Sequence, residues 1–189
     1  MNLNSNIIAN RTLTEQINPK SIDLDNLSTI DIVQLFSNED LEPQKAVQKA
    51  IPEIVKAVDN ITLRLRDEGR LFYLGTGTSG RLGILDAAEC PPTFCTSPEM
   101  VQGILAGGDK AIKRSSENLE DSNTLAINDL KKKNFSHKDV LIGISASGST
   151  PYVLSALGYS KMKKALSISI SSVPKIDSDI ECDIDIRLL

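Results

Sequence analysis

The stretch that decides the fold is Leu71-Phe-Tyr-Leu-Gly-Thr-Gly-Thr-Ser-Gly80-Arg-Leu-Gly-Ile-Leu-Asp-Ala-Ala88. A short apolar run, Arg70–Leu74, predicts a buried strand. After a turn rich in glycine and hydroxyl groups, apolar residues at helical spacing predict a helix over Gly80–Ala88. A strand that passes through a glycine turn into a helix is typical of the start of a βαβ unit.

The rest of the chain repeats this alternation. Further strands are predicted at Met100–Ala106, Asp139–Ser145, Ala165–Ile170 and Ile180–Ile186, the last an edge strand because apolar and acidic residues alternate. Further helices are predicted at Asp109–Ser116, Glu120–Lys133 and Thr150–Lys163. Alternating strands and helices predict an α/β fold, a three-layer αβα sandwich with a mostly parallel sheet.

A helical arm is expected in front of this sandwich. Residues 1–42 form the predicted arm, with a short helix at Ser28–Phe36 capped by Ser28 or Thr29, and residues 43–189 form the predicted domain. The stretch Pro43–Glu68 carries one apolar stripe, and Pro52 should kink or split it. An arm of this length is expected to pack on a neighbour or on a second subunit.

Composition excludes several classes of protein. The 189 residues are 40% hydrophobic and 24% charged, with a net charge of −4 and no basic block, which argues against disorder and against nucleic-acid binding. No apolar run has the roughly 18 residues that a membrane span needs. Residues 1–13 lack the pattern of a secretory signal, so a cytoplasmic protein is expected.

Cysteine and histidine are scarce. The chain has 3 Cys and 1 His, too few for a disulfide framework, and they are not spaced as metal ligands. We therefore expect no metal site.

The turn Gly75–Arg81 satisfies the pattern Gly-x-Gly-x-x-Gly, which also occurs in dinucleotide-binding proteins. That interpretation requires an acid at the end of the second strand, and Asp109 fits this spacing poorly. The hydroxyls of Thr76, Thr78 and Ser79 suit a monophosphate better, because they add donors to the amides of a helix start. The alternative is a tight turn that binds nothing.

A second turn of the same design, Ser145–Tyr152, follows the third predicted strand. On its own this turn is weak evidence for an anion site, because Ser and Thr also cap helices. Two such turns at one edge of a sheet favour a shared anion between them.

Two acidic segments are candidates for chemistry. Glu89 is expected at the end of a helix terminated by Pro91 and Pro92, where a carboxylate opposes the helix dipole, although a solvated helix end is the plain alternative. Glu120 and Asp121 begin a predicted helix, where an acid favours the dipole without any catalytic role.

Taken together, the string Gly75–Pro92 and the segments Thr14–Pro19, Ile104–Gly108, Glu120–Ser122 and Ser147–Tyr152 resemble the N-acetylmuramic acid 6-phosphate etherase family of the sugar isomerase (SIS) superfamily. The resemblance implies an SIS domain, a homodimer, and no metal or organic cofactor. It also implies cleavage of the lactyl ether of a sugar-phosphate substrate, in cytoplasmic recycling of cell-wall sugar.

The resemblance also implies site residues. Glu89 would donate a proton to the leaving lactate and Glu120 would act as the base, with the opposite assignment left open. The implied substrate-binding residues are Thr76, Gly77, Thr78, Ser79, Ser147, Gly148, Ser149 and Thr150.

Two departures from the family pattern leave alternatives open. The family usually has arginine where this chain has Ser149, and its chains continue past Leu189, so this chain is expected to be shortened at its C-terminus. A non-catalytic sugar-phosphate-binding protein or an inactive fragment is therefore the main alternative. An aldose–ketose isomerase on the same fold is less favoured.

Overall fold

The computed structural model describes residues 13–114 and 119–189, so the end of the helix expected at Asp109–Ser116 lies outside the described residues. Five strands form one sheet in the order β2-β1-β3-β4-β5, and every neighbouring pair is parallel. The strands are β1 (Leu71–Gly75), β2 (Val101–Leu105), β3 (Val140–Ile144), β4 (Leu166–Ser171) and β5 (Ile184–Arg187). The predicted parallel sheet is confirmed.

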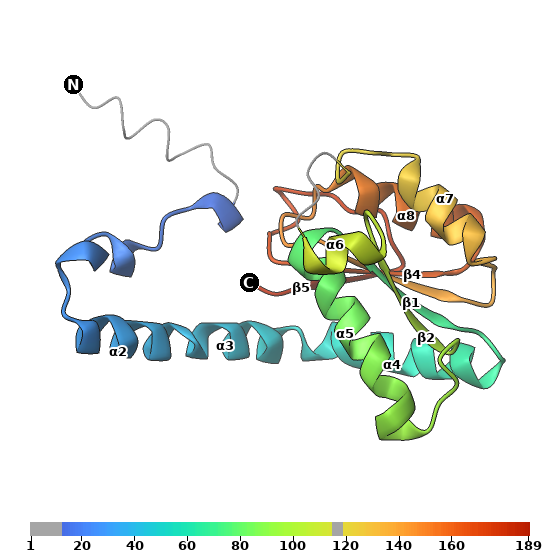
Figure 1. Cartoon of the computed structure of the whole chain (residues 1–189), viewed down its shortest axis with the longest axis horizontal. Coiled ribbons are helices and arrows are strands. Elements are labelled where there is room, and N and C mark those ends of the chain that lie inside the picture. Colours follow the sequence, from blue (N-terminus) through green and yellow to red (C-terminus); the bar gives the residue numbers. More distant parts are fainter. Residues whose placement is uncertain (1–12, 115–118) are drawn as a thin grey trace.

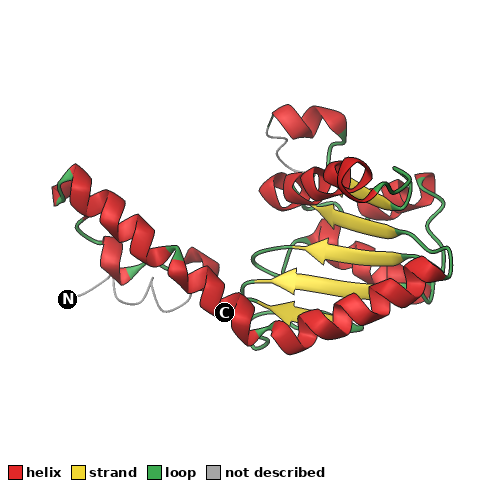
Figure 2. Cartoon of the chain, turned by 90° about the horizontal axis from the view of Figure 1, so that it is seen from below, coloured by secondary structure: helices red, strands yellow, loops and turns green. Residues whose placement is uncertain are grey.

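Helices cover both faces of the sheet, which gives three layers (Figure 2). The helices packed on the sheet are α4 (Ile51–Arg66), α5 (Gly77–Phe94), α6 (Asp109–Lys113), α7 (Leu125–Lys132) and α8 (Pro151–Met162). Side chains alternate along each strand, so Phe72 and Leu74 pack in the core beneath α7 and α8, while Leu71 and Tyr73 face α4 and α5. The predicted αβα sandwich is therefore correct.

The arm lies apart from these layers. Figure 1 shows α2 (Thr29–Glu39) and α3 (Leu41–Lys49) projecting from the sheet as an extended rod, after short 3₁₀ turns at Leu13–Glu15, Pro19–Ser21 and Leu24–Asn26. Ser28 caps α2 by accepting a hydrogen bond from the Asp31 amide, as predicted. The predicted boundary between residues 42 and 43 falls inside α3, and the division into two domains remains a prediction.

Proline splits the long helical stretch where expected. The chain turns at Ala50, with φ −87° and ψ 0°, and Pro52 occupies the first turn of α4, where its missing amide costs no helical hydrogen bond.

The predicted end of α5 is wrong. The helix begins at Gly77 instead of Gly80, and it continues through Pro91 and Pro92 to Phe94. The two prolines lie in its last turns, where each removes only one hydrogen bond, and Cys95 closes the helix by donating to the Pro91 carbonyl at 2.9 Å. Glu89 is therefore inside a helix and not at its end.

The predicted start of α7 and start of β5 are also wrong. α7 begins at Leu125, so Glu120 lies in the loop before it. β5 begins at Ile184, because Ile180 and Cys182 pack instead against the core beneath α8. Asp183, just before β5, and Asp185 within it accept hydrogen bonds from Ser167 and Ser169, which satisfies two of the serine hydroxyls that β4 buries.

Candidate sugar-phosphate site

The two hydroxyl-rich loops emerge side by side. β2 and β3 lie on opposite sides of β1, so the order in which strands are added to the sheet reverses at β1, although all the strands stay parallel. The last residues of β1 and β3, Gly75 and Ile144, are paired in register. Ligands in parallel sheets bind at the carboxyl ends of strands where such a reversal occurs. The fold therefore brings the loops at Thr76–Gly80 and Ser145–Thr150 together, as the sequence predicted.

The first loop leads directly into α5. Thr76 is its N-cap with extended backbone, and its side chain caps no helix amide. The amides of Gly77, Thr78 and Ser79 belong to the first turn, which has no carbonyl partners within the helix. Since Gly77 and Thr78 are exposed and Thr76 and Ser79 are partly buried, these donors face an open site suited to an anion.

Close packing requires glycine in this loop. A Cβ on Gly80 would lie 2.6 Å from the Gly75 carbonyl oxygen, and one on Gly75 would lie 2.8 Å from the Gly80 nitrogen. Gly77 has φ +52°, a left-handed conformation that disfavours other residues. The first turn of α5 is thereby held against the end of β1.

Hydroxyls in the second loop bond to one another. The Ser145 and Thr150 hydroxyls are 2.8 Å apart, and the Ser149 hydroxyl donates to Ser147 Oγ at 2.9 Å. Gly148 has φ +64° and donates its amide to the Ser145 carbonyl at 3.0 Å. Thr150 precedes α8 without capping it by its side chain. The loop is thus an organised turn that presents serine hydroxyls and amides, rather than a plain helix cap.

Glu120 lies beside the second loop. Its carbonyl accepts a hydrogen bond from the Tyr152 amide at 2.9 Å, in the first turn of α8, and its side chain is exposed. The helix dipole role considered for Glu120 is wrong, because no helix begins there. Its backbone is instead held to the first turn of α8.

Glu89 lies far from that loop within one chain. It is exposed on α5, twelve residues after Gly77 and thus roughly 18 Å along the helix axis. Its neighbours Ala88 and Pro91 line a groove with Pro98 and Val101, at the amino end of β2. The structure therefore does not bring Glu89 and Glu120 of one chain around a common cleft.

A segment that sequence reasoning missed also contacts the second loop. After β4, the Ser172 amide donates to the Ala146 carbonyl at 2.9 Å, and the Ser178 hydroxyl donates to the Gly148 carbonyl at 2.5 Å. We refer to residues 172–178 as the strap. Its signal in the sequence was the Ser171-Ser172 pair after the fourth strand, whose carboxyl end lies next to that of β3.

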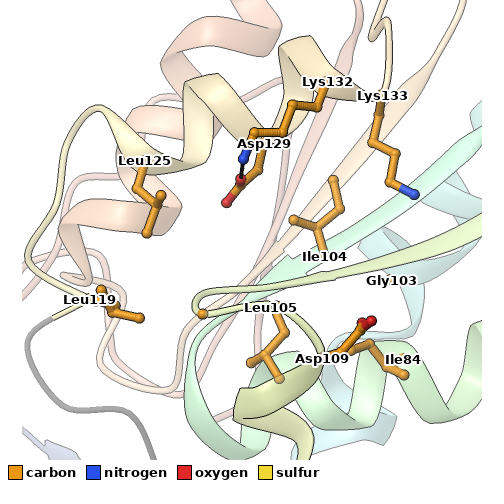
Figure 3. A pocket seen from close by; sticks show the side chains of 12 residues that line it. Ile84, Gly103, Ile104, Leu105, Asp109, Leu119, Leu125, Asp129, Lys132 and Lys133 are labelled. Atoms are coloured by element: carbon orange, nitrogen blue, oxygen red, sulfur yellow. Dashed lines mark hydrogen bonds and ion pairs between the residues drawn. The ribbon is translucent and has the colours of Figure 1, made fainter.

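A cavity of about 440 Å³ opens between β2 and α7. Figure 3 shows α7 carrying Asp129 and Lys132, which pair at 3.0 Å, with Ile104 and Leu105 of β2 below them. Leu119, which precedes Glu120, closes one end of the cavity. The residues predicted for the site do not line this cavity, so the cavity adds no support to their roles.

Two tyrosines near the loops are held protonated. Burial, together with neighbouring Asp129, raises the pKa of Tyr152 well above its ordinary value. Burial and a hydrogen bond to Asp86 likewise raise the pKa of Tyr73 beneath α5. Neither phenol is therefore available as an anionic base.

The described ranges lack a cluster of metal ligands and a helix that could span a membrane. Among residues 13–114 and 119–189, no group of three or more His, Cys, Asp or Glu side chains is placed to hold a metal ion. In the same residues, no helix is both long and apolar enough to cross a bilayer.

Comparison with known proteins identifies the fold family. The family described as the glucokinase regulatory protein N-terminal SIS domain matches residues 53–161. The chain belongs to this SIS-domain family. The SIS fold of the chain is also similar to a phosphoheptose isomerase from Francisella tularensis, with TM-score 0.67 and 16% identity, covering 86% of this chain and 87% of that one. A phosphoheptose isomerase from Neisseria gonorrhoeae gives TM-score 0.62 and 20% identity over 84% and 83% of the two chains.

Several relatives of this SIS protein with high identity carry the same name. A protein of Prochlorococcus marinus (strain NATL2A), named N-acetylmuramic acid 6-phosphate etherase, is 63% identical over 188 residues, which cover 100% of this chain and 61% of the relative. A protein of Synechococcus sp. (strain CC9605) with the same name is 54% identical over 177 residues, covering 94% of this chain and 56% of the relative. The SIS chain thus spans about three fifths of the length of such relatives.

Proposed function

We propose that this chain binds N-acetylmuramic acid 6-phosphate and cleaves its D-lactyl ether, giving N-acetylglucosamine 6-phosphate and D-lactate. The observation that carries the proposal is the meeting of two hydroxyl-rich loops beside Glu120, at the carboxyl ends of β1 and β3. The names of relatives at 53–63% identity support the choice of reaction.

The phosphate binds between the loops in this proposal. Amides of the first turn of α5 and the hydroxyls of Ser79 and Ser147 surround it, and no lysine is required because the helix start favours an anion. Ser149 supplies a hydroxyl where the family usually has an arginine guanidinium. The affinity for phosphate in this chain therefore depends more on the backbone amides of the two loops. Binding of the remote phosphate then positions the reacting carbons.

The chemistry requires one base and one acid. When the sugar ring opens, the aldehyde acidifies the C2 proton, and the Glu120 carboxylate removes it. The electron pair forms the C2–C3 double bond, the C3–oxygen bond breaks, and the lactate oxygen takes a proton from Glu89. Water then adds across the double bond, placing hydroxyl on C3 and hydrogen on C2. These steps need no electron transfer, so the proposed reaction uses no cofactor.

Glu89 acts in the site of a second copy in this proposal, because it lies too far from the loops of its own chain. On α5, Leu82, Leu85 and Glu89 recur at three- and four-residue steps and so share one face. Leu82 is 57% exposed and Leu85 is 58% exposed. A second copy that covers these leucines would also enclose Glu89, which makes a homodimer the proposed active form.

Further exposed apolar side chains support a homodimer. They also occur on α4, α3 and α2, and the members on those three helices are Ile30, Val33, Phe36, Leu41, Val47, Ile51, Val55, Val58 and Leu63. Exposed apolar side chains in such number are unusual on monomers and typical of interfaces. The proposed place of the reaction is the cytoplasm, in the recycling of cell-wall sugar.

Binding without turnover is the second candidate. It is favoured by the separation of Glu89 from the loops, since a chain that remained a monomer would hold the phosphosugar beside one carboxylate only. A sugar-phosphate-binding protein of this kind would need the two loops but neither glutamate.

The test is release of D-lactate from N-acetylmuramic acid 6-phosphate. We expect turnover by the unchanged chain, a loss of roughly 10²–10⁴-fold in Glu120→Gln, and near-normal rates in Asp121→Asn, a matched exposed neighbour. Saturable binding of the phosphosugar without lactate would favour the second candidate. If neither lactate nor binding is found, both are refuted.

A further inference from the structure

Arg187 lies at the carboxyl end of the edge strand β5 and is largely buried, with 11% of its side chain exposed. Its Nε and Nη2 both lie 2.7 Å from Asp185 Oδ2. The rest of the guanidinium turns toward the strap, donating to the Val173 carbonyl at 2.9 Å and to the Ser178 carbonyl at 2.7 Å. One side chain therefore fixes both ends of residues 173–178 to the sheet.

The strap in turn lies against the second loop. Besides the hydrogen bonds from Ser172 and Ser178 to the Ala146 and Gly148 carbonyls, contact is close at Gly148. A Cβ there would lie 3.0 Å from Ser178 Oγ and 3.1 Å from Val173 Cγ2. The position of the loop thus depends on where Arg187 holds the strap.

These two hydrogen bonds fix the direction of two peptide units. In a trans peptide the carbonyl and the following amide point in opposite directions. Because the Ala146 and Gly148 carbonyls point toward the strap, the amides of Ser147 and Ser149 point away from it. Ser149 is exposed, and its amide has only a long contact of 3.3 Å with Ser147 Oγ. Backbone amides that are directed toward an open loop surface can bind an anion there.

We propose that Arg187 is a positioning residue for phosphosugar binding, acting through the strap to aim the Ser147 and Ser149 amides at the phosphate. This inference rests on the proposed phosphate site between the loops. Arg187 itself does not touch the ligand, because its donors are directed to Asp185 and to the carbonyls of the strap. The buried position and fork geometry explain why arginine serves here and lysine does not.

The experiment measures binding without turnover. Calorimetry with N-acetylglucosamine 6-phosphate gives the Kd of the unchanged chain, of Arg187→Gln and of Ser178→Ala, and inorganic phosphate serves as a second probe. We expect each substitution to raise the Kd about tenfold, the size of one hydrogen bond's loss. Ser178→Thr keeps the hydroxyl and should bind with the Kd of the unchanged chain. Lys175→Ala is the matched control: Lys175 lies on the same segment but pairs with exposed Asp179, so this variant should also leave the Kd unchanged.

The double variant Arg187→Gln/Ser178→Ala separates action through the strap from independent effects. If Arg187 and Ser178 both act through the strap, the Kd of the double variant is no higher than that of the weaker-binding single variant. If their effects are independent, the two increases in Kd multiply. Multiplied effects, or an unchanged Kd in folded Ser178→Ala, overturn the inference even if Arg187→Gln fails to fold. If the unchanged chain binds neither probe, the proposed function itself falls.

Discussion

At the scale of single residues, Asp139 is the most completely buried charged residue in the part of the chain that the structure describes, with 1% of its surface exposed. Arg70 pairs with it at 2.8 Å, and the Ser136 amide donates to it at 2.8 Å. Burial acts to raise the pKa of Asp139, but the hydrogen bonds from Arg70 and Ser136 outweigh it and hold that pKa below its ordinary value. The folded state therefore favours the ionised form.

Replacing this carboxylate should destabilise the protein in a pH-dependent way. Because the folded pKa is lowered, the stabilisation is present above the unfolded pKa and is lost as pH falls through the folded pKa. We expect Asp139→Asn to lower the free energy of unfolding by about 3 kcal/mol at neutral pH. Urea unfolding between about pH 7 and about pH 3 should show the difference shrinking toward acid. A gap that is constant with pH would contradict the assigned cause.

Ser79 tests the first loop. Its amide lies in the unpaired first turn of α5, and its hydroxyl is expected to contact the phosphate. Ser79→Ala should raise the KM for the phosphosugar about tenfold or more, with kcat little changed, because the lost contact is the same in ground and transition states. Steady-state lactate release measures both constants. A fall in kcat at constant KM would remove Ser79 from phosphate binding.

At the scale of elements, the strands were the most predictable part. β1 to β4 match their predicted ranges to within one residue at every end, because short apolar runs bounded by glycine or polar residues rarely form anything other than a buried strand. Their parallel pairing then placed the two loops together by topology alone. The predicted anion loops are thus correct in position, while their ligand remains a prediction.

Helix ends were less predictable, because long-range contacts decide them. The acids at Glu120 and Asp121 resemble a helix start, but the Glu120 carbonyl is taken by the Tyr152 amide of another helix. The sequence did not predict the strap, because contacts between distant residues also decide its position. Arg187 of the edge strand β5 donates to the Val173 and Ser178 carbonyls, which precede it by 14 and 9 residues. Local sequence patterns do not contain such contacts.

Tyr152 connects two elements at the site. It is fully buried, its amide binds Glu120, and its hydroxyl donates to Asp129 of α7 at 3.0 Å. Tyr152→Phe removes the hydrogen bond to Asp129, which helps to hold α7 and the loop before it, and leaves the two phosphate loops unchanged. We therefore expect kcat for lactate release to fall several-fold with little change in KM. Lys132→Gln, which breaks only the exposed ion pair with Asp129, is the matched control. A rise in KM alone would disprove this separation.

Packing of α5 on the sheet depends on Gly103. A Cβ at this position would lie 2.6 Å from Ile84 Cα, which belongs to the helix backbone. Gly103→Ala should therefore cost about 1–3 kcal/mol of unfolding free energy. In contrast, a Cβ on Gly158, at an exposed position of α8, meets none of the described atoms within 4 Å, so Gly158→Ala should stabilise by about 0.5–1 kcal/mol. Thermal or urea unfolding of both variants checks the opposite signs.

At the scale of the whole molecule, two inactive variants should complement each other. If Glu89 serves the site of a second copy, a mixed dimer of Glu89→Gln and Glu120→Gln contains one site with both carboxylates intact. Refolding an equal mixture should restore about a quarter of the unchanged activity, since half of the dimers are mixed and half of their sites are complete. Lactate release from the mixture is the measurement. Activity no higher than that of either variant alone would place Glu89 elsewhere.

The apolar face of α5 gives an independent check on assembly. Leu85→Glu should shift the protein toward the monomer in sedimentation at micromolar concentration, because it places a charge within the proposed interface. Met162→Glu, at the more exposed end of α8, should not change the mass observed. A monomeric unchanged chain would refute the proposed homodimer.

One consequence follows from the length of α5. The helix starts in the loop proposed for the phosphate, is clamped to β1 through Gly80 and Gly83, and ends in an exposed turn at Phe94. Ile84 and Ala87 also pack against the sheet, so α5 is held along most of its length. The distance between the loop proposed for the phosphate and Glu89 is therefore set by a rigid helix, and a second copy that meets Glu89 stands at a fixed separation from that loop.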